Sequence, residues 1–394
     1  MTEYDVIVVG AGGSGLAAAV SAAQRGGRVL VLEKQPQPGG TTGIAVGSFS
    51  AAGTSLQKRA KIADTPQHHV EDLPKFAPPE IEARNAPEMR DFFLTQSAQT
   101  LEWLRDMHLA FVGPSPEPPN RANRMHNVVP GAKAYIARLQ IELAKRGGTL
   151  ICDAGVEDLL WDGDRVCGVQ VTVPSPTQVA SPVTQGNSRE RQTVSFHARR
   201  GVVLAAGDYA NNPEIIAEHK GSKFEKIEGI NPTATGDGHA LASKAGATLV
   251  NMDVTYGPEL RFVASSRKPF QQWLPSTGFW ATCLGWLAGW SPNWILNAMI
   301  KRLLVTWQHP EDALFDDGAI LVNSDGKRFV DETSSPHREI EVANQPGKIA
   351  YILLDGRLAD RYSAWPHFVS TAPDIAYAYV ADYRRLRPDV THSS

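Results

Sequence analysis

Three glycines near the N-terminus have the spacing of a turn that binds a pyrophosphate. Gly10, Gly12 and Gly15 follow the apolar run from Asp5 to Val9 in G-x-G-x-x-G order. In such a turn the first glycine permits the sharp exit from a strand, the second lets the backbone approach a phosphate, and the third allows close helix–strand packing. The following helix N-terminus offers N–H groups and partial positive charge to the phosphates. The stretch therefore predicts a dinucleotide-binding turn rather than an ordinary glycine-rich turn.

A carboxylate closes the second strand of the same unit. The Ala-rich residues 16–25 predict a helix that Gly26 and Gly27 end, and residues 28–32 predict a strand that is followed by Glu33. The apolar run of the first strand is typical of a strand that is buried on both faces. At the end of the second strand, Glu33 is placed to accept hydrogen bonds from a ribose diol. It would repel a ribose phosphate, which argues against an NADP-type ligand.

The composition is that of an ordinary globular protein with more than one domain. The 394 residues are 42% hydrophobic and 21% charged, and the net charge of -3 does not suggest a nucleic-acid partner. Cys152, Cys167 and Cys283 lie far apart and have no metal-binding spacing, which favours small buried thiols in a reducing compartment. We find no signal-peptide pattern and no apolar run of spanning length, so we expect a cytoplasmic protein with no membrane contact.

A second run of small residues, Pro38 to Gly43, suits a ligand larger than a nicotinamide dinucleotide. Together with the opening unit and Glu33-Lys34, it resembles the FAD-binding domain of the fumarate reductase/succinate dehydrogenase flavoprotein superfamily, which includes the 3-ketosteroid dehydrogenases. Later segments extend the resemblance to about residue 357. They are the returning strand Gly201–Asp208, the T-G-D-G motif at 235–238 and a G-x-R-F-x-N-E-like motif at 326–332.

The resemblance implies an α/β fold, with a Rossmann-like FAD-binding domain of the GR2 type, a small β-meander and an α+β capping domain. We place the FAD-binding domain at residues 1–253, with a Pro-rich insertion near 110–130 and a loop at 174–200. The capping domain, which would bind the substrate, is placed at 254–394. No histidine lies between residues 39 and 53, so we expect noncovalent FAD. The cofactor contacts implied are Gly10, Gly12, Gly13, Ser14, Gly15, Glu33, Lys34, Gly39, Gly40, Thr41, Thr42, Val156, Ala206, Gly207 and Asp237.

Three further stretches carry expectations that a structure can test. Residues 86–107 predict a helix with an apolar side made of Phe92, Phe93, Leu101, Trp103 and Leu104. The cluster Arg121, Arg124 and His126 could approach a ligand carboxylate, although we favour a solvated loop. Six of the nine tryptophans lie between residues 273 and 307. We favour the core of a second domain there over a greasy lid at a substrate entrance or a membrane surface.

The resemblance places the substrate between the two domains, near the segment after Glu332. Fumarate reductases carry a proton-donating arginine four residues after the corresponding glutamate, but this chain has Pro336 there. The acidic and basic residues that feed that arginine are also not matched, because Asp312 and Phe315 occupy those places. Fumarate reduction is therefore disfavoured, unless Arg338 has taken over the role.

His337 and Arg338 are the catalytic candidates in that segment. A histidine can act as an acid or base near neutral pH, and the alternative is that His337 is a surface residue. Arg328 and Glu332 are expected to hold the loop. We identify no metal-ligand set.

The function implied is that of an FAD-dependent oxidoreductase acting on a C–C bond next to a carbonyl. Ketosteroid-like or other apolar enone substrates come first, and unsaturated carboxylates second. The expected partners are a small-molecule substrate and an electron-transfer protein. The strand that normally returns to the FAD domain is not found before Ser394, so we expect an incomplete capping domain. A non-catalytic or inactive FAD-binding protein remains the alternative.

Overall fold

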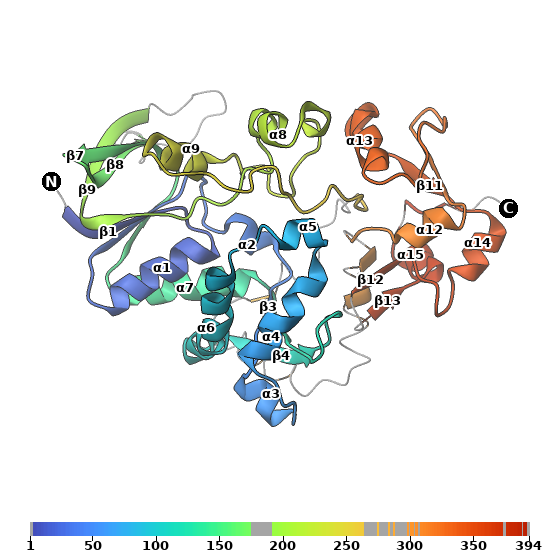
Figure 1. Ribbon diagram of the computed structural model, residues 1–394, viewed down its shortest axis with the longest axis horizontal. Helices are drawn as coiled ribbons and strands as arrows, with labels where there is room; N and C mark the ends of the chain where they lie inside the picture. The colour runs from blue at the N-terminus through green and yellow to red at the C-terminus, as the bar shows by residue number, and fades with distance from the viewer. Residues whose placement is uncertain are drawn as a thin grey trace.

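One six-stranded sheet forms the centre of the N-terminal part of the chain, which lies at the left of Figure 1. The computed structural model describes residues 3–174, 191–263, 274–275, 283, 287, 298, 300–302, 304–305, 308–372, 376–387 and 389–391. The sheet has the strand order β6 (Thr149–Ile151), β2 (Val29–Leu32), β1 (Glu3–Val9), β9 (Arg191–Leu204), β8 (Arg165–Pro174) and β7 (Gly155–Asp162). The first four strands run parallel and the last three pair antiparallel. The expected α/β class, with its Rossmann-like parallel strands, is confirmed.

The expected β-meander is present, but it is continuous with the parallel sheet. The long strand β9 pairs with β8 along residues 191–197 and with β1 along residues 197–204. Residues 191–200, which were assigned to a loop or hairpin arm, are therefore strand. The reason is the alternation of Val194, Phe196 and Ala198 with more polar neighbours, which is typical of a half-buried strand. The expectation for residues 175–190 lies outside the described residues.

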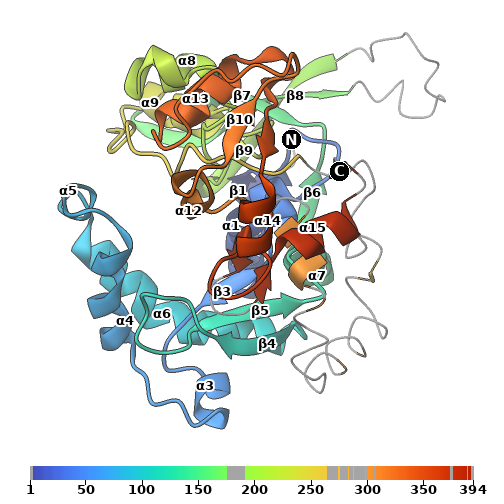
Figure 2. The same cartoon turned by 90° about the vertical axis from the view of Figure 1, so that its right-hand side faces the viewer.

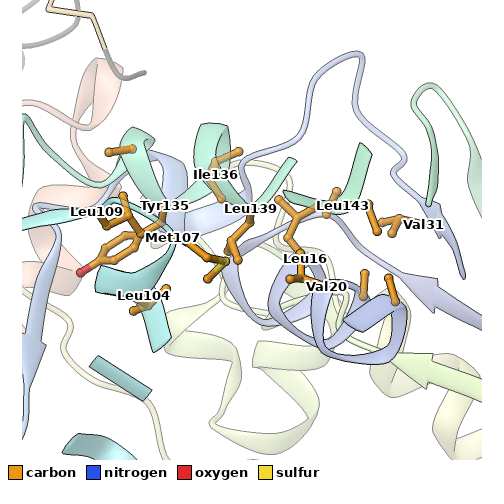
Figure 3. Close-up of a cluster of buried hydrophobic side chains, with 14 of the residues drawn as sticks. Leu16, Val20, Val31, Leu104, Met107, Leu109, Tyr135, Ile136, Leu139 and Leu143 are labelled. Atoms are coloured by element: carbon orange, nitrogen blue, oxygen red, sulfur yellow. The ribbon is translucent and has the colours of Figure 1, made fainter. Parts of the chain in front are cut away.

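Hydrophobic cores cover both faces of the parallel strands, as the apolar run of β1 predicted. On one face, α1 (Gly13–Gln24) and α7 (Lys133–Lys145) pack together over the strands (Figure 3). The buried side chains of α1 recur at i, i+3, i+4 and i+7, and they are Leu16, Ala19, Val20 and Ala23. On the other face, Ile7 and Leu30 share a core with Leu241 of α9 (Asp237–Lys244). These two layers fix the end of β1, from which the glycine turn departs.

The insertion between β2 and β6 carries a small antiparallel sheet and several helices (Figure 2). The sheet has the order β3 (Ser48–Ser50), β5 (Met125–Val129) and β4 (Ala110–Ser115). The helical segments are α2 (Gly40–Ile44), α3 (Ser55–Arg59), α4 (Pro66–Asp72), η1 (Leu73–Phe76), α5 (Pro79–Glu82) and α6 (Pro87–Asp106).

The predicted helix at 86–107 is α6, but its apolar side was partly wrong. Phe92 and Phe93 are 67% and 61% exposed, whereas Leu94, Leu101 and Leu104 are buried. These three leucines stand at i, i+7 and i+10 and so form one stripe along the helix. The two phenylalanines lie outside that stripe, and their side chains are exposed to solvent.

The expectation of a solvated loop is wrong for Arg124 and His126, which are buried, whereas Arg121 is exposed. Arg124 is fully buried, and its guanidinium donates to Asp64 at 2.7 Å and to Asp72 at 2.8 Å. His126 is also fully buried, with Nε2 at 3.1 Å from Thr54 Oγ1. Arg121 pairs with the Asp72 carboxylate at 2.9 Å. Arg124 lies in a buried ion network, because Asp64, which precedes α4, and Asp72, the last residue of α4, meet it from 60 and 52 residues away in sequence.

The C-terminal part has a separate hydrophobic core (Figure 1). It contains two antiparallel strand pairs, β10 (Ile320–Val322) with β11 (Tyr351–Leu353) and β12 (Ser370–Ala372) with β13 (Ala376–Ala378). Its helical segments are α12 (Asp312–Asp316), α13 (His337–Asn344), η5 (Pro346–Lys348), α14 (Gly356–Arg361) and α15 (Val380–Leu386). Between the two parts lie α8 (Pro213–His219) and η3 (Ser222–Phe224). We retain 1–253 and 254–394 as proposed domain bounds.

Two expectations about membranes and tryptophans have different outcomes. Within the part of the chain that the structure describes, no helix has the length and apolar character needed to cross a membrane. The six tryptophans between residues 273 and 307, for which a domain core or a lid was considered, lie outside the described residues.

We predict that Arg124→Met destabilises the fold by about 3–5 kcal/mol, because it leaves two buried carboxylates without their cation. Urea unfolding followed by circular dichroism measures the effect. Arg84→Met is the matched control, since the Arg84–Asp253 pair is solvent-exposed, with side chains 38% and 51% accessible, and exposed pairs contribute little. Equal losses in the two variants would contradict a structural role for the buried network.

Candidate active site

The glycine turn after β1 is packed so tightly that side chains cannot enter it, except at Gly12. A Cβ at Gly10, which has φ +103°, would lie 2.4 Å from Ala205 O, and a Cβ at Gly15 would lie 2.0 Å from Gly10 O. Both are clashes with backbone atoms. A Cβ at Gly12 has no neighbour closer than 3.9 Å. The backbone at Gly12 is therefore open on the side that a phosphate would approach.

Residues 39–42 form the opposite wall of this turn. Gly39 N donates to Ala11 O at 3.1 Å, and Gly13 N donates to Thr42 Oγ1 at 3.2 Å. A Cβ on Gly40 would lie 3.2 Å from Gly12 Cα. The helix α1 begins after Gly12 without a side-chain cap, and Ser14 in its first turn is exposed. The helix N-terminus thus faces a surface made of backbone and hydroxyl groups.

Glu33 is buried at the end of β2, where it also orders the glycine turn. Its Oε2 accepts a hydrogen bond from Ala11 N at 2.8 Å, and its Oε1 accepts one from Gln35 N at 2.9 Å. Each carboxylate oxygen can accept a further hydrogen bond. The side chain therefore remains able to bind a ribose diol while it holds the turn.

The T-G-D-G motif is tied to the same corner through Lys34. The Lys34 ammonium donates to Thr235 Oγ1 at 2.6 Å and to Asp237 Oδ2 at 2.9 Å. Burial raises the pKa of Asp237, but hydrogen bonds from Thr235 and Lys34 outweigh it and hold the pKa below its usual value. The ion pair joins the end of β2 to the N-terminus of α9, two segments about 200 residues apart.

The remaining predicted cofactor residues come from the end of β9 and from β7. Ala206 lies against the turn, since a Cβ on Gly10 would be 3.0 Å from Ala206 Cα. Gly207 follows with φ +86°, a left-handed conformation that favours glycine. Val156 is partly buried in β7, next to the parallel core. Asn231, which sequence reasoning missed, donates from Nδ2 to Thr41 Oγ1 at 3.1 Å.

The residues around the turn fit FAD. The open backbone at Gly12, the uncapped helix N-terminus and the buried carboxylate of Glu33 are the parts that a dinucleotide requires. Gly10, Gly12, Gly13, Gly15, Gly39, Gly40, Thr42 and Ala206 meet around the turn, with Glu33, Lys34 and Asp237 at one corner.

A cavity of about 590 Å³ lies between the segment that follows the returning strand and the capping part. One wall comes from Lys220 and Phe224 at α8 and η3 and from residues 256–260. The other comes from residues 309–313 at α12 and from Ser335, Pro336, Arg338 and Glu339 at α13. The two catalytic candidates therefore differ in position. Arg338 lines the cavity, whereas His337 is exposed at the first residue of α13.

Arg338 is held by carboxylates and an aromatic ring. It is 5% exposed, its Nη2 donates to Asp312 Oδ1 at 2.7 Å, and its Nε donates to Glu339 Oε1 at 2.9 Å. The guanidinium lies 4.6 Å from the centre of the Phe315 ring. Burial lowers the pKa of Arg338, but the hydrogen bonds that it donates to Asp312 and Glu339 raise the pKa above its usual value. Asp312, which was regarded as unmatched, is therefore an acidic partner of an arginine.

The motif before this loop is structural, as expected. Arg328 Nη2 donates to Glu332 Oε2 at 2.6 Å, and Glu332 Oε1 accepts from Leu321 N at 2.8 Å. Arg338 Nη1 donates to Glu332 O at 3.0 Å. Glu332 thus connects β10 to the start of α13 and fixes where Arg338 lies.

Two carboxylates of the cavity were missed by sequence reasoning. Glu311 Oε1 and Glu339 Oε2 are buried, and neither has a hydrogen-bond partner within the described ranges. Burial, together with the negative charge of Asp312, raises the pKa of Glu311 to about 7. The adjacent carboxylates Glu311 and Asp312 were visible in the sequence, but burial could not be read from it.

We predict that Gly12→Ala weakens FAD binding without unfolding the protein. The backbone at Gly12 is extended, with φ -75° and ψ -173°, so an alanine fits, and its Cβ occupies the space that a phosphate would need. We expect at least a tenfold weaker affinity, about 1.4 kcal/mol or more, measured by fluorescence quenching of added FAD. Gly356→Ala is the control, because its Cβ would meet nothing within 4 Å at a site in the capping part. Unchanged binding in Gly12→Ala would contradict the assigned phosphate position.

We predict that Glu311→Gln raises the melting temperature at pH 8 and leaves it unchanged near pH 4.5. The folded pKa of about 7 lies above the usual value of 4.5, so the fold retains a proton that the unfolded chain releases. Stability therefore falls as the pH rises through this window, and a neutral glutamine removes the loss. Differential scanning fluorimetry at both pH values measures it, with the exposed Glu225→Gln as control. An equal shift at both pH values would refute the raised pKa.

Comparisons with known proteins agree with this geometry. A family profile described as "FAD binding domain" matches residues 5–263. A fumarate reductase (cytochrome) of Shewanella frigidimarina is 28% identical over 356 residues, which cover 89% of this chain and 52% of that protein. A 3-oxosteroid 1-dehydrogenase of Mycolicibacterium smegmatis is 24% identical over 444 aligned positions, which cover 91% of this chain and 69% of that protein.

The fold is similar to that of a solved flavocytochrome c3 fumarate reductase in an open conformation. The TM-score is 0.65 at 22% identity, over 91% of this chain and 54% of that structure. This chain spans between 34% and 52% of the length of four fumarate reductase relatives. The match over residues 5–263 covers more than half of the chain, and the glycine turn, Glu33 and the returning strand all lie inside it. The chain therefore belongs to the FAD-binding domain family of flavoproteins.

Proposed function

We propose that this protein is an FAD-dependent oxidoreductase that adds or removes hydrogen across a C–C bond next to a carbonyl. The observation that carries the proposal is the glycine turn, which opens only at Gly12 and faces a buried Glu33. The resemblance to fumarate reductases and 3-oxosteroid 1-dehydrogenases supports the reaction class. The substrate is a small molecule, either an apolar enone or an unsaturated carboxylate.

The residues of the turn would hold the cofactor in place. The N-terminus of α1 binds the pyrophosphate, because its N–H groups and the helix dipole favour negative charge. Glu33 accepts the ribose hydroxyls, and residues 39–42 cover the phosphates from the other side. FAD, when bound, supplies the two-electron exchange, in which a hydride moves to or from one carbon of the substrate.

The loop 335–338 would serve the substrate carbon that exchanges a proton. In dehydrogenation one carbon loses a proton to a base while the adjacent carbon loses a hydride, and reduction is the reverse. His337 is proposed as the proton-transfer group, since an imidazole can take up or release a proton near neutral pH. Arg338 is proposed as the fixed cation of the cavity wall, because its two carboxylate partners keep it protonated.

We also propose an electron-transfer partner for this protein. The names of two relatives, fumarate reductase (cytochrome) and NADH:fumarate oxidoreductase, include a redox partner. A flavin that has accepted electrons must pass them on before a second turnover, so a partner or a second substrate is required by the chemistry. A cytoplasmic location is proposed with it.

The first test is the visible absorption spectrum of the purified chain before and after desalting. We expect an oxidised-flavin spectrum that survives desalting and that steroids or unsaturated acids change under anaerobic conditions. A colourless protein that fails to take up added FAD would contradict the proposal. A stable flavin spectrum that no carbonyl compound changes would favour the non-catalytic alternative.

We predict that variants of His337 and Arg338 affect different substrate classes. If His337 is the base, His337→Phe lowers dehydrogenation of a 3-ketosteroid by about 10²-fold or more and leaves FAD affinity unchanged. Arg338→Gln is expected to lower reduction of an unsaturated carboxylate at least tenfold, about 1.4 kcal/mol in transition-state stabilisation. Stopped-flow flavin absorbance measures both rates. Arg338→Lys, which retains the charge, should recover part of the loss, and full activity in both variants would exclude this loop.

A further inference from the structure

The electrostatics of the cavity between α8 and α13 distinguish between neutral and anionic substrates. Four carboxylates line it, and the permanent cations that line it are Arg338 and Lys220. Arg338 is already compensated by Asp312 and Glu339, with which it shares hydrogen bonds. Its charge is therefore not available to a substrate carboxylate without breaking these pairs.

Lys220 is held at the opposite wall by neutral groups. Its ammonium donates to Thr255 Oγ1 and to Gly257 O, and it lies 5.0 Å from the centre of the Phe224 ring. Burial lowers the pKa of Lys220, so the wall does not favour its charge. The Lys220 ammonium is thus engaged by a hydroxyl, a carbonyl and an aromatic ring. It is a single cation in a cavity that several carboxylates line.

Two of the carboxylates that line the cavity, Glu311 and Glu339, each have one buried oxygen without a hydrogen-bond partner in the described structure. Glu339 is 5% exposed, and its Oε1 binds Arg338 while its Oε2 has no partner in the described part of the chain. Glu311 Oε1 is likewise buried and unpartnered there. A buried polar atom without a hydrogen bond is costly. A ligand that supplies the missing partner would therefore be bound selectively.

We propose that Glu311 determines substrate specificity by donating a hydrogen bond, in its neutral form, to the carbonyl oxygen of an uncharged substrate. The inference deepens the proposed function and rests on it, since it names the substrate class of the same cavity. A substrate carboxylate at this place would meet Asp312 and Glu339 at the same wall, and like charges at short distance in a desolvated site repel strongly. Neutral carbonyl compounds are thus preferred over carboxylates.

The groups around Glu311 support its neutral form. Asp312 follows it on α12, and α13 contributes Arg338, whose charge is shared with Asp312 and Glu339. Tyr383 of α15 is also near Glu311, and burial is the main reason that the pKa of this phenol is raised. The remaining titratable or charged groups that line the cavity are Lys220, Tyr256, Glu259 and His309. No cation in the described structure forms an ion pair with Glu311, so burial decides its protonation.

The test is calorimetric titration of the FAD-loaded chain with three ligands that share a skeleton. They are trans-4-phenyl-3-buten-2-one, which is neutral, trans-cinnamate, which is anionic, and cinnamylamine, which is cationic. At pH 6 we expect the ketone to bind at least tenfold more tightly than cinnamate. Its affinity should fall severalfold at pH 8.5, because Glu311 has then lost its proton. Tighter binding of cinnamate or of the amine at pH 6 would overturn the inference.

Glu311→Gln provides the matched comparison, because the amide retains a donor and cannot ionise. We expect the variant to bind the ketone equally at pH 6 and pH 8.5 and to bind cinnamate more tightly than the wild type does. Glu225→Gln, an exposed change outside the cavity, should leave both affinities as they were. A pH dependence that persists in Glu311→Gln would show that another group discriminates.

The absorbance of bound flavin in the same samples separates the two possible failures. A chain that does not take up FAD contradicts the proposed function, whichever ligand it binds. A chain with bound FAD and no preference for the ketone contradicts only the role of Glu311. The wild-type titrations alone decide the question if the variant does not fold.

Discussion

The contact between the glycine turn and the end of β9 is the constraint on which the rest of the structure depends. Gly10 and Gly15 have no room for a side chain, because the backbone of Ala205 and of Gly10 itself fills the space. This close approach fixes the N-terminus of α1 over the carboxyl ends of the parallel strands, where open α/β sheets bind their ligands. Glu33 accepts a hydrogen bond from the turn, and Lys34 pairs with Asp237 of the T-G-D-G motif. The cofactor site is therefore a property of backbone packing more than of side chains.

The second site depends on charge compensation between elements that are distant in sequence. Arg338 of α13 is buried only because Asp312 and Glu339 accept its hydrogen bonds, and Glu332 places it by accepting one from the guanidinium on its backbone oxygen. The compensation leaves an excess of carboxylate oxygen in the cavity, including that of Glu311, whose pKa is raised to about 7 by burial and by the charge of Asp312. A buried cation that is already paired is an anchor for the fold and not for an anionic ligand. The same contacts that stabilise the loop thus also engage the charge that Arg338 would otherwise present to the cavity.

A similar network of buried ion pairs stabilises the insertion between β2 and β6. Arg124 joins Asp64 and Asp72, and burial together with the charge of Arg124 lowers the pKa of His69 to about 4, so that this histidine is neutral. Charged side chains that read as a solvated loop in the sequence are in fact the core of this region. In both networks a buried arginine meets at least one carboxylate from a distant segment, and no local sequence pattern predicts such a contact.

The sequence by itself determined the parallel strands and the glycine turn, because these depend on local spacing and on glycine geometry that has few alternatives. The cofactor contacts named from it stay predictions. The sequence also predicted the helix at 86–107 and the position of Glu33. Only the tertiary structure decided that residues 191–200 extend the sheet, that Phe92 and Phe93 are exposed, and that Glu311 Oε1 is buried without a partner in the described part of the chain. These outcomes depend on which distant segments pack together, and burial sets both the exposure of a side chain and the proton affinity of a carboxylate. Local spacing carries no information about either.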